Sequence, residues 1–378
     1  MKFMNNRKTY NLSDICRFVT SRTCNIENYI STENMLPNKG GITSPSNIPN
    51  GSAIAYQLGD VLISNIRPYF QKIWLANCNG ACSADVLCIR ANEKANSKYV
   101  YYLLSQQKFF DYVMSGAKGC KMPRGDKSQI MQWQISLPPL TEQKRIADIL
   151  SAIDDKIELN RRINANLEQQ AQVLYKSWFV DFEPFGGKMP EDWREGTLGE
   201  ICTELKEKVH ERDDVKVLSP VATGQLMLSE EFFTKQVYSK SIAKYIVVPQ
   251  NCFAYNPARV NIGSLGMNEF DFDGCVSPVY VVFRCQNGYE YFFDLFRQTK
   301  PFKDEVKLRA IGGVRQTLSY DDFARIQVNI PTYNVVQEFN KIYLTNLDVR
   351  WHNQYEILRL AQLRDTLLPK LMSGEIKA

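Results

Sequence analysis

The chain is poor in the residues that catalytic and metal sites most often need. Its 378 residues include only two histidines, His210 and His352, which lie far apart in the sequence. Ten cysteines are scattered without a single Cys-x-x-Cys pair, so the paired ligand spacing of a zinc site is missing. We therefore expect no bound metal and reduced thiols in protein cores. A Ser-His-Asp triad is disfavoured because His352 falls inside a long helical pattern.

Sequence signatures of cofactor binding are also missing. Residues 263–266 (Gly-Ser-Leu-Gly) lack the Gly-Lys-Ser/Thr ending of a phosphate loop, and no Gly-x-Gly-x-x-Gly follows a strand pattern. Residues 256–259 (Asn-Pro-Ala-Arg) do not match the Asn-Pro-Pro-Tyr type of motif that lines the base pocket of DNA adenine methyltransferases. We expect a chain that binds no cofactor itself and is not catalytic alone.

Long apolar runs are lacking as well. No stretch of eighteen apolar residues occurs, and no apolar run follows the charged start of the chain. We therefore expect a cytoplasmic protein with no membrane partner. The net charge of +5 and the pI near 8.5 permit an anionic partner without requiring one.

What the chain does have is an internal duplication. Residues 12–16 (Leu-Ser-Asp-Ile-Cys) are echoed by residues 198–202 (Leu-Gly-Glu-Ile-Cys), at an offset of 186 residues. Residues 135–138 (Ile-Ser-Leu-Pro) are echoed by residues 328–331 (Val-Asn-Ile-Pro), at an offset of 193. The repeat is therefore a whole domain plus a helix. Two similar units on one chain can pack about a pseudo-twofold axis, which suits a target with two halves such as duplex DNA.

A long helix follows each copy of the globular unit. The first is expected from Thr141, as N-cap, to about Phe179, and the second from Asn334, as N-cap, to about Ser373. Each would hold about 40 residues and measure about 60 Å. Apolar residues recur at alternating steps of four and three, which predicts a coiled-coil seam. The predicted seam residues are Ile146, Leu150, Ile153, Ile157, Asn160, Leu167, Leu174, Trp178, Phe339, Asn353, Ile357, Leu360, Leu367 and Leu371.

The duplication and the two helices together predict the fold. We expect an α+β chain with two similar globular domains, separated by two long antiparallel helices that form a coiled coil with pseudo-twofold symmetry. The midpoints of the helices would then place Asn160 beside Asn353. The expected parts are a first domain (1–138), a first helix (139–182), a linker (183–196), a second domain (197–331) and a second helix (332–378).

Four segments resemble the specificity subunits of type I restriction-modification systems. Residues 137–150 (Leu-Pro-Pro-Leu-Thr-Glu-Gln-Lys-Arg-Ile-Ala-Asp-Ile-Leu) and 154–160 (Asp-Asp-Lys-Ile-Glu-Leu-Asn) are similar to the central conserved region of that family. Residues 178–185 (Trp-Phe-Val-Asp-Phe-Glu-Pro-Phe) and the ending at 363–376 are also typical of it. The start of the second helix, residues 333–339, departs from the usual opening. The resemblance covers nearly the whole chain.

The resemblance implies how such a chain works. Each globular domain would be a target-recognition domain that reads one half of a split double-stranded DNA sequence, and the helices would hold the two domains apart. The chain would dock adenine-methyltransferase subunits, which carry S-adenosylmethionine and the methylating site. In a full restriction complex, ATP-driven nuclease and translocase subunits would join them. The chain itself would bind no cofactor.

Base recognition needs close approach of the backbone and cations for the phosphates. Residues 116–127 supply glycines and four cations, and residues 309–317 occupy the same position in the second domain. An Arg after a strand pattern is also repeated between the domains. The predicted DNA-binding residues are Lys118, Lys121, Arg124, Lys127, Arg309, Arg315, Gln316, Arg67 and Arg259.

Two other functions remain open from the residues alone. A coiled-coil assembly scaffold without direct DNA readout would also use the long helices, although it would not need the paired basic loops. A self-sufficient DNA methyltransferase or nuclease would need the cofactor and metal motifs that the sequence lacks. A binding assay with DNA and the methyltransferase partner separates the first of these from a specificity subunit, and an assay of methyl transfer by the isolated chain tests the second.

Overall fold

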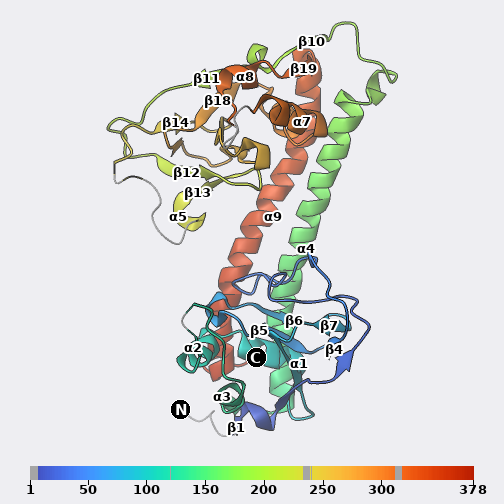
Figure 1. The fold of residues 1–378 in the computed structure, drawn as a ribbon, viewed down its shortest axis with the longest axis vertical. Coiled ribbons are helices and arrows are strands. Elements are labelled where there is room, and N and C mark those ends of the chain that lie inside the picture. The colour runs from blue at the N-terminus through green and yellow to red at the C-terminus, as the bar shows by residue number, and fades with distance from the viewer. Residues whose placement is uncertain (1–6, 120, 233–238, 240, 311–316) are drawn as a thin grey trace. The chain divides into compact units, whose positions relative to one another are not determined.

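The computed structural model describes residues 7–119, 121–232, 239, 241–310 and 317–378 (Figure 1). The chain divides into two compact units. Unit 1 comprises residues 1–162 and 353–378, and unit 2 comprises residues 163–352. The two long helices, α4 (Leu140–Phe179) and α9 (Tyr333–Ser373), each contribute to both units. Each compact unit is therefore larger than a predicted globular domain, because it includes part of both helices.

Unit 1 contains the first copy of the globular fold. Its strands are β1 (Lys8–Asn11), β2 (Cys16–Phe18), β3 (Arg22–Thr23), β4 (Ala53–Tyr56), β5 (Val61–Ser64), β6 (Ile73–Leu75), β7 (Gly80–Cys82), β8 (Val86–Ala91) and β9 (Gln134–Leu137). Its short helices are α1 (Ser97–Leu104), α2 (Gln107–Ser115) and α3 (Lys127–Met131), with 3-10 turns η1 (Leu12–Asp14) and η2 (Pro68–Phe70).

Unit 2 contains the second copy. Its strands are β10 (Arg194–Thr197), β11 (Cys202–Leu205), β12 (Lys216–Pro220), β13 (Leu226–Leu228), β14 (Ile246–Val248), β15 (Phe253–Tyr255), β16 (Leu265–Met267), β17 (Gly274–Val276), β18 (Val281–Cys285) and β19 (Gln327–Ile330). Its helices are α5 (Ser229–Phe232), α6 (Glu290–Phe296), α7 (Lys300–Arg309) and α8 (Tyr320–Ala324), with 3-10 turns η3 (Glu183–Phe185), η4 (Leu198–Glu200) and η5 (Val260–Ile262).

The two units repeat one topology. A four-stranded sheet has the order β2-β8-β5-β6 in unit 1 and β11-β18-β15-β16 in unit 2. A two-stranded pair, β1-β9 or β10-β19, joins the start of each globular part to its final strand. The helices α1, α2 and α3 follow the sheet in the same order as α6, α7 and α8. This agreement of strand order confirms the duplication predicted from the echoed segments and the α+β class.

Local sequence explains most of these elements. All four residues of β5 are buried because β8 and β6 flank it in the sheet, which fits its continuous apolar sequence. Side chains cap the short helices: Asn96 accepts a hydrogen bond from the backbone N–H of Tyr99, and Asp126 caps α3 in the same way.

The structure differs from the sequence predictions at the starts of both long helices, and one aromatic-rich segment forms two helices. The segment from Tyr99 to Phe110 forms α1 and α2, with a break at Ser105 and Gln106 between its two apolar stretches. The long helices begin at Leu140 and Tyr333, one residue before the predicted caps Thr141 and Asn334. Both predicted cap residues therefore lie in the first turn, because the carbonyl oxygens of Pro139 and Thr332 already accept the first helical hydrogen bonds, from the N–H groups of Gln143 and Val336.

The ends of the long helices complete the core of each unit. In unit 1, Leu150 of α4 and Leu371 of α9 join the apolar cluster that is built on β5, β8 and α1. In unit 2, Tyr175 of α4 and Phe339 of α9 join the cluster built on β15, β18 and α6. In each unit, the parts of α4 and α9 that belong to it therefore pack on each other and on the globular domain of the same unit.

Polar contacts give the direction of the helix pair within each unit. In unit 1, Asp154 of α4 pairs with Arg364 of α9 at 2.9 Å, and Lys156, further along α4, pairs with Glu356 at 3.4 Å. In unit 2, Asn164 donates to the backbone oxygen of Arg350 at 3.2 Å, and Tyr175, further along α4, packs on Phe339 with ring centroids 6.4 Å apart. In each unit, the residue numbers of the contact partners on α9 decrease as the residue numbers on α4 increase. The two helices therefore run antiparallel inside each unit, as predicted.

Asn160 lies at the middle of α4 and is fully buried. Its side-chain amide donates a hydrogen bond of 2.7 Å to Glu356, one helical turn beyond the predicted partner Asn353. Its carbonyl oxygen has no hydrogen-bond partner among the described residues. The hydrogen bond that this buried amide donates is therefore to a carboxylate, and the pairing of Asn160 with Asn353 stays a prediction.

Membrane-spanning helices and metal-ligand clusters are both missing from the described parts of the chain. None of the helices there is long and apolar enough to cross a lipid bilayer. No group of three or more His, Cys, Asp or Glu side chains in those parts is placed to hold a metal ion.

Candidate nucleic-acid interface

In unit 1, the turn between β5 and β6 lies against the glycine-rich loop between α2 and α3. The backbone N–H of Arg67 donates to the carbonyl oxygen of Pro123 at 2.8 Å. Within the loop, Lys118 and Arg124 exchange two backbone hydrogen bonds of 2.9 Å. The structure thus brings Arg67 close to Lys118, Pro123 and Arg124, although they are more than fifty positions apart in the sequence.

The cations of this surface differ in how they are paired. Lys118 forms an ion pair of 2.9 Å with Asp126, and Arg124 forms one of 3.0 Å with Asp85. The hydrogen bond to Asp126 raises the pKa of Lys118 above its ordinary value. Lys121 and Lys127 are exposed and form no ion pair with any described residue. These two lysines could therefore bind a DNA phosphate without first breaking an ion pair with a carboxylate.

Arg67 is held in an unusual conformation. Its φ of 51° lies in the left-handed region, which a residue with a side chain adopts at a cost. Its Nε is buried without a hydrogen-bond partner among the described residues. The pKa of the nearby Lys72 is lowered, first by burial and then by the positive charge of Arg67. Positive charge is therefore gathered beside the turn.

The equivalent surface of unit 2 is only partly described. Arg259 is exposed in the turn after β15, immediately before η5, as Arg67 stands immediately before η2 in unit 1. The N–H of Leu318 donates to the carbonyl oxygen of Pro257 at 3.1 Å, so the loop after α7 again meets the hairpin turn. The predicted residues Arg315 and Gln316 lie outside the described residues.

Arg309 has a different environment from the one expected. It is the last residue of α7, and its side chain is half-buried and paired with Glu305 at 2.8 Å. This i to i+4 pair within one helix indicates a structural role for Arg309, because its guanidinium already has a carboxylate partner.

Sequence reasoning missed the exposed apolar residues of this surface. Tyr69 is 48% exposed and Phe70 38% exposed on the η2 turn, and Met122 is 49% exposed on the neighbouring loop. In unit 2, Ile262 of the η5 turn is 58% exposed. The sequence contained a signal for them, because an apolar residue follows the repeated Arg in both domains. An apolar residue near a strand is, however, usually interpreted as part of the core.

None of the predicted seam residues of the long helices is exposed. Seven are buried and seven are half-buried. The buried residues are Ile146, Leu150, Ile157, Asn160, Phe339, Ile357 and Leu371. The half-buried residues are Ile153, Leu167, Leu174, Trp178, Asn353, Leu360 and Leu367. Buried helix residues outside the predicted seam, such as Tyr175 and Phe179, belong to the core of unit 2.

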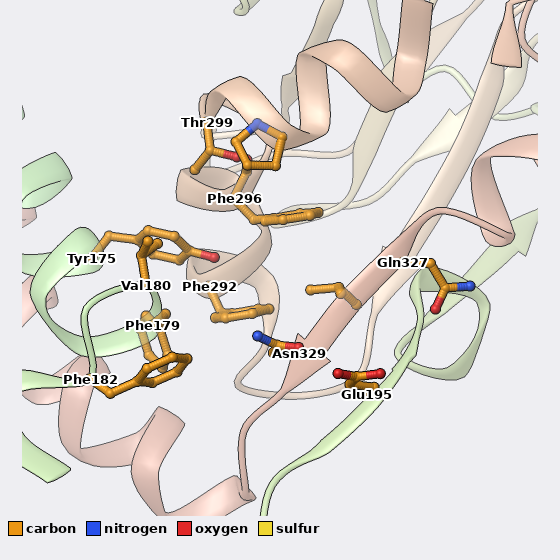
Figure 2. A pocket seen from close by; sticks show the side chains of 12 residues that line it. Tyr175, Phe179, Val180, Phe182, Glu195, Phe292, Phe296, Thr299, Gln327 and Asn329 are labelled. Carbon is orange, nitrogen blue, oxygen red and sulfur yellow. The ribbon is translucent and has the colours of Figure 1, made fainter. Parts of the chain in front are cut away.

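A separate cavity of about 470 Å³ lies in unit 2. Figure 2 shows Tyr175 and Phe179 of α4 beside Phe292 and Phe296 of α6 along its wall. The polar side chains at its edge include Glu195, and no Lys or Arg lines it. An aromatic wall without cations does not suit a phosphate, so this cavity is not part of the candidate DNA surface.

Comparison with known proteins connects this geometry to one family. The sequence model of the type I restriction modification DNA specificity domain matches residues 4–169. The specificity subunit of the type I restriction enzyme HindI from Haemophilus influenzae is 24% identical, over 99% of this chain and 100% of that protein. The MjaIX specificity subunit from Methanocaldococcus jannaschii is 26% identical, over 74% of this chain and 69% of that protein.

A solved structure shares the fold. The S subunit of a type I restriction-modification system from M. genitalium superposes with a TM-score of 0.59 at 15% sequence identity, over 98% of each chain. The family model thus covers the first globular domain and most of α4, and the chain is similar to type I restriction enzyme specificity subunits, one of them over that protein's full length.

Proposed function

We infer that this chain is the subunit that gives a type I restriction-modification complex its DNA sequence specificity. It reads a split target in double-stranded DNA, with one half assigned to each globular domain. The observation that carries this conclusion is the repeated pairing of a hairpin turn with a basic loop. Unit 1 pairs η2 with the loop after α2, and unit 2 pairs η5 with the loop after α7.

The two surfaces suit DNA for physical reasons. Exposed cations such as Lys121 and Lys127 can meet phosphates and release counterions, which supplies affinity that does not depend on sequence. The loop backbones and nearby side chains can then approach base edges, which supplies specificity. The two domains have different residues on their loops, as expected if they read different half-sites.

The partners and cofactors follow from the family. We propose that the chain docks adenine-methyltransferase subunits, which carry S-adenosylmethionine, and that nuclease and translocase subunits join in a restriction complex. The chain itself would bind no cofactor, and the complex would work in the cytoplasm, where the DNA is. The lack of cofactor motifs in the sequence supports this division of labour.

Lys121→Ala and Arg315→Ala are each expected to weaken DNA binding by the assembled complex by about 1 kcal/mol, or about fivefold. Each substitution removes one phosphate contact, so the dependence of log affinity on log salt should fall by about one unit. The measurement is a fluorescence anisotropy titration with the target duplex at several salt concentrations.

Arg162→Ala is the matched control for both variants. Arg162 is an exposed cation on α4 that pairs with Glu158, and it lies outside both loops. Its loss should change DNA affinity less than twofold. If the two loop variants bind like the wild type and keep its salt dependence, these loops do not contact DNA. A complex that binds no DNA at all would favour the scaffold alternative.

A further inference from the structure

Both units build the same turn beside the basic loop. An Arg, either Arg67 or Arg259, is followed by a one-turn 3-10 helix. Each turn ends in a residue with left-handed backbone, Gln71 with a φ of 51° in unit 1 and Gly263 with a φ of 94° in unit 2. Each turn connects two antiparallel strands of the main sheet, β5 to β6 or β15 to β16. The same local structure therefore recurs where the sequences differ.

Each turn buries its first residue and exposes an apolar residue at its end. Pro68 and Val260 are buried under the turns. Phe70 and Ile262, in the third position of each turn, are 38% and 58% exposed, and Tyr69 beside Phe70 is 48% exposed. We call these three exposed residues the apolar tips. Their exposure is not needed for folding, because the buried first residue already anchors the turn.

Hydrogen bonds hold the turns in place. In unit 1, Asn38 donates to the carbonyl oxygen of Phe70 at 2.8 Å and Lys39 donates to that of Gln71 at 3.0 Å. In unit 2, Gly263 donates to the carbonyl oxygen of Val260 at 3.0 Å, and a Cβ added to Gly263 would lie 2.5 Å from the oxygen of Ala222. The apolar tips are therefore presented on a fixed backbone, which reduces the entropy lost when they bind a partner.

The surroundings indicate what the tips contact. Arg67, Lys72 and the exposed Lys121 gather positive charge near η2, and Arg259 starts η5. An apolar protein partner would remove water from these positive charges without offering them a negative partner. DNA would pair them with phosphates. On the edge of a base, the group that suits an apolar side chain is the C5-methyl of thymine in the major groove.

We propose that the apolar tips determine specificity by contacting thymine methyl groups, with Tyr69 and Phe70 serving one half-site and Ile262 the other. This inference rests on the proposed function and identifies which residues read bases in it. The cations of the neighbouring loops position the DNA, and the tips discriminate between bases. The tips contact no phosphate, so they contribute to specificity without contributing to the salt dependence of binding.

The test uses the full chain assembled with its methyltransferase subunits and duplexes of the methylated target. In one set of duplexes a single thymine is replaced by uracil, which lacks only the C5-methyl group. For the wild type, a single replacement at the contacted thymine of either half-site should weaken binding about fourfold, the loss expected for one buried methyl group. The double variant Tyr69→Ala/Phe70→Ala should weaken binding and become insensitive to uracil in its half-site only, and Ile262→Ala should do the same for the other half-site.

Matched controls separate this result from a folding defect. Leu58→Ala and Val279→Ala remove apolar residues that are 66% and 70% exposed elsewhere in units 1 and 2, and both should keep wild-type affinity and uracil sensitivity. Ile262→Val keeps an apolar tip and should keep most of the discrimination. All variants should show an unchanged dependence of affinity on salt.

The outcomes also distinguish this inference from the proposed function. If the wild type binds a split target but both tip variants remain sensitive to uracil, the thymine contact is wrong and the specificity function stands. A target half-site without any thymine on either strand would also overturn it. If the wild-type complex shows no sequence preference, the proposed function is wrong, and the inference about the apolar tips falls with it.

Discussion

Phe339→Ala is expected to lower the free energy of unfolding of unit 2 by about 3–5 kcal/mol, the usual loss for truncating a buried Phe. Phe339 is fully buried near the start of α9. Its ring lies 4.9 Å from that of Phe179 and 5.8 Å from that of Trp178, both at the end of α4. One side chain therefore joins the two long helices to the core of unit 2, and its loss leaves a cavity that rigid aromatic neighbours cannot fill.

Leu344→Ala is the matched control for this prediction. Leu344 lies on the same helix in the same unit, but it is 40% exposed, so its truncation should cost less than about 1 kcal/mol. Hydrogen–deuterium exchange of peptides from β15 and β18 measures the difference, because these strands exchange only when unit 2 opens. Equal protection in the two variants would show that Phe339 does not anchor the helices.

Asp60→Ala is expected to destabilise unit 1 by about 3 kcal/mol or more, because it leaves the largely buried guanidinium of Arg90 without its carboxylate partner. Asp60 is buried, and it accepts two hydrogen bonds from Arg90 at 2.8 and 2.7 Å. It also accepts one from the backbone N–H of Gln57 at 2.8 Å, which fixes the turn before β5. The turn and the strand that support η2 therefore depend on one carboxylate.

Glu158→Ala serves as the control for Asp60→Ala. Glu158 pairs with Arg162 on the surface of α4, where both side chains are more than half exposed, so its loss should cost less than about 1 kcal/mol. Exchange of peptides from β5 and β8 reports the stability of unit 1 in both variants. A loss of protection no larger than that of the control would mean that the Arg90 pair does not stabilise the sheet.

The overall fold could be predicted because its signals are periodic or repeated. The heptad pattern located both long helices to within one residue at their starts, since an amphipathic pattern of about 40 residues is seldom formed by anything but a long helix. The echoed segments at Leu12 and Leu198 predicted two similar domains. The break between α1 and α2 could not be predicted in this way, because residues 105–108 (Ser-Gln-Gln-Lys) contain no Gly or Pro and are compatible with a continuous helix.

The candidate site was predictable only in part. Glycines and clustered charge located the loop after α2, because both properties are visible in a local stretch of sequence. The ion pair between Arg124 and Asp85 joins residues from distant segments, and no local pattern indicates it. The exposure of Tyr69 and Ile262 was missed for a related reason, since only the folded structure shows which apolar residues remain uncovered.

Genome-wide mapping of methylated adenines, with and without this chain beside its methyltransferase subunits, tests most directly whether the two domains read two separate half-sites. We expect a single motif of two short defined halves, separated by a fixed number of undefined bases, that disappears when the chain is absent. An unchanged methylation pattern without the chain, or an uninterrupted motif with it, would contradict this division of the target between the two domains.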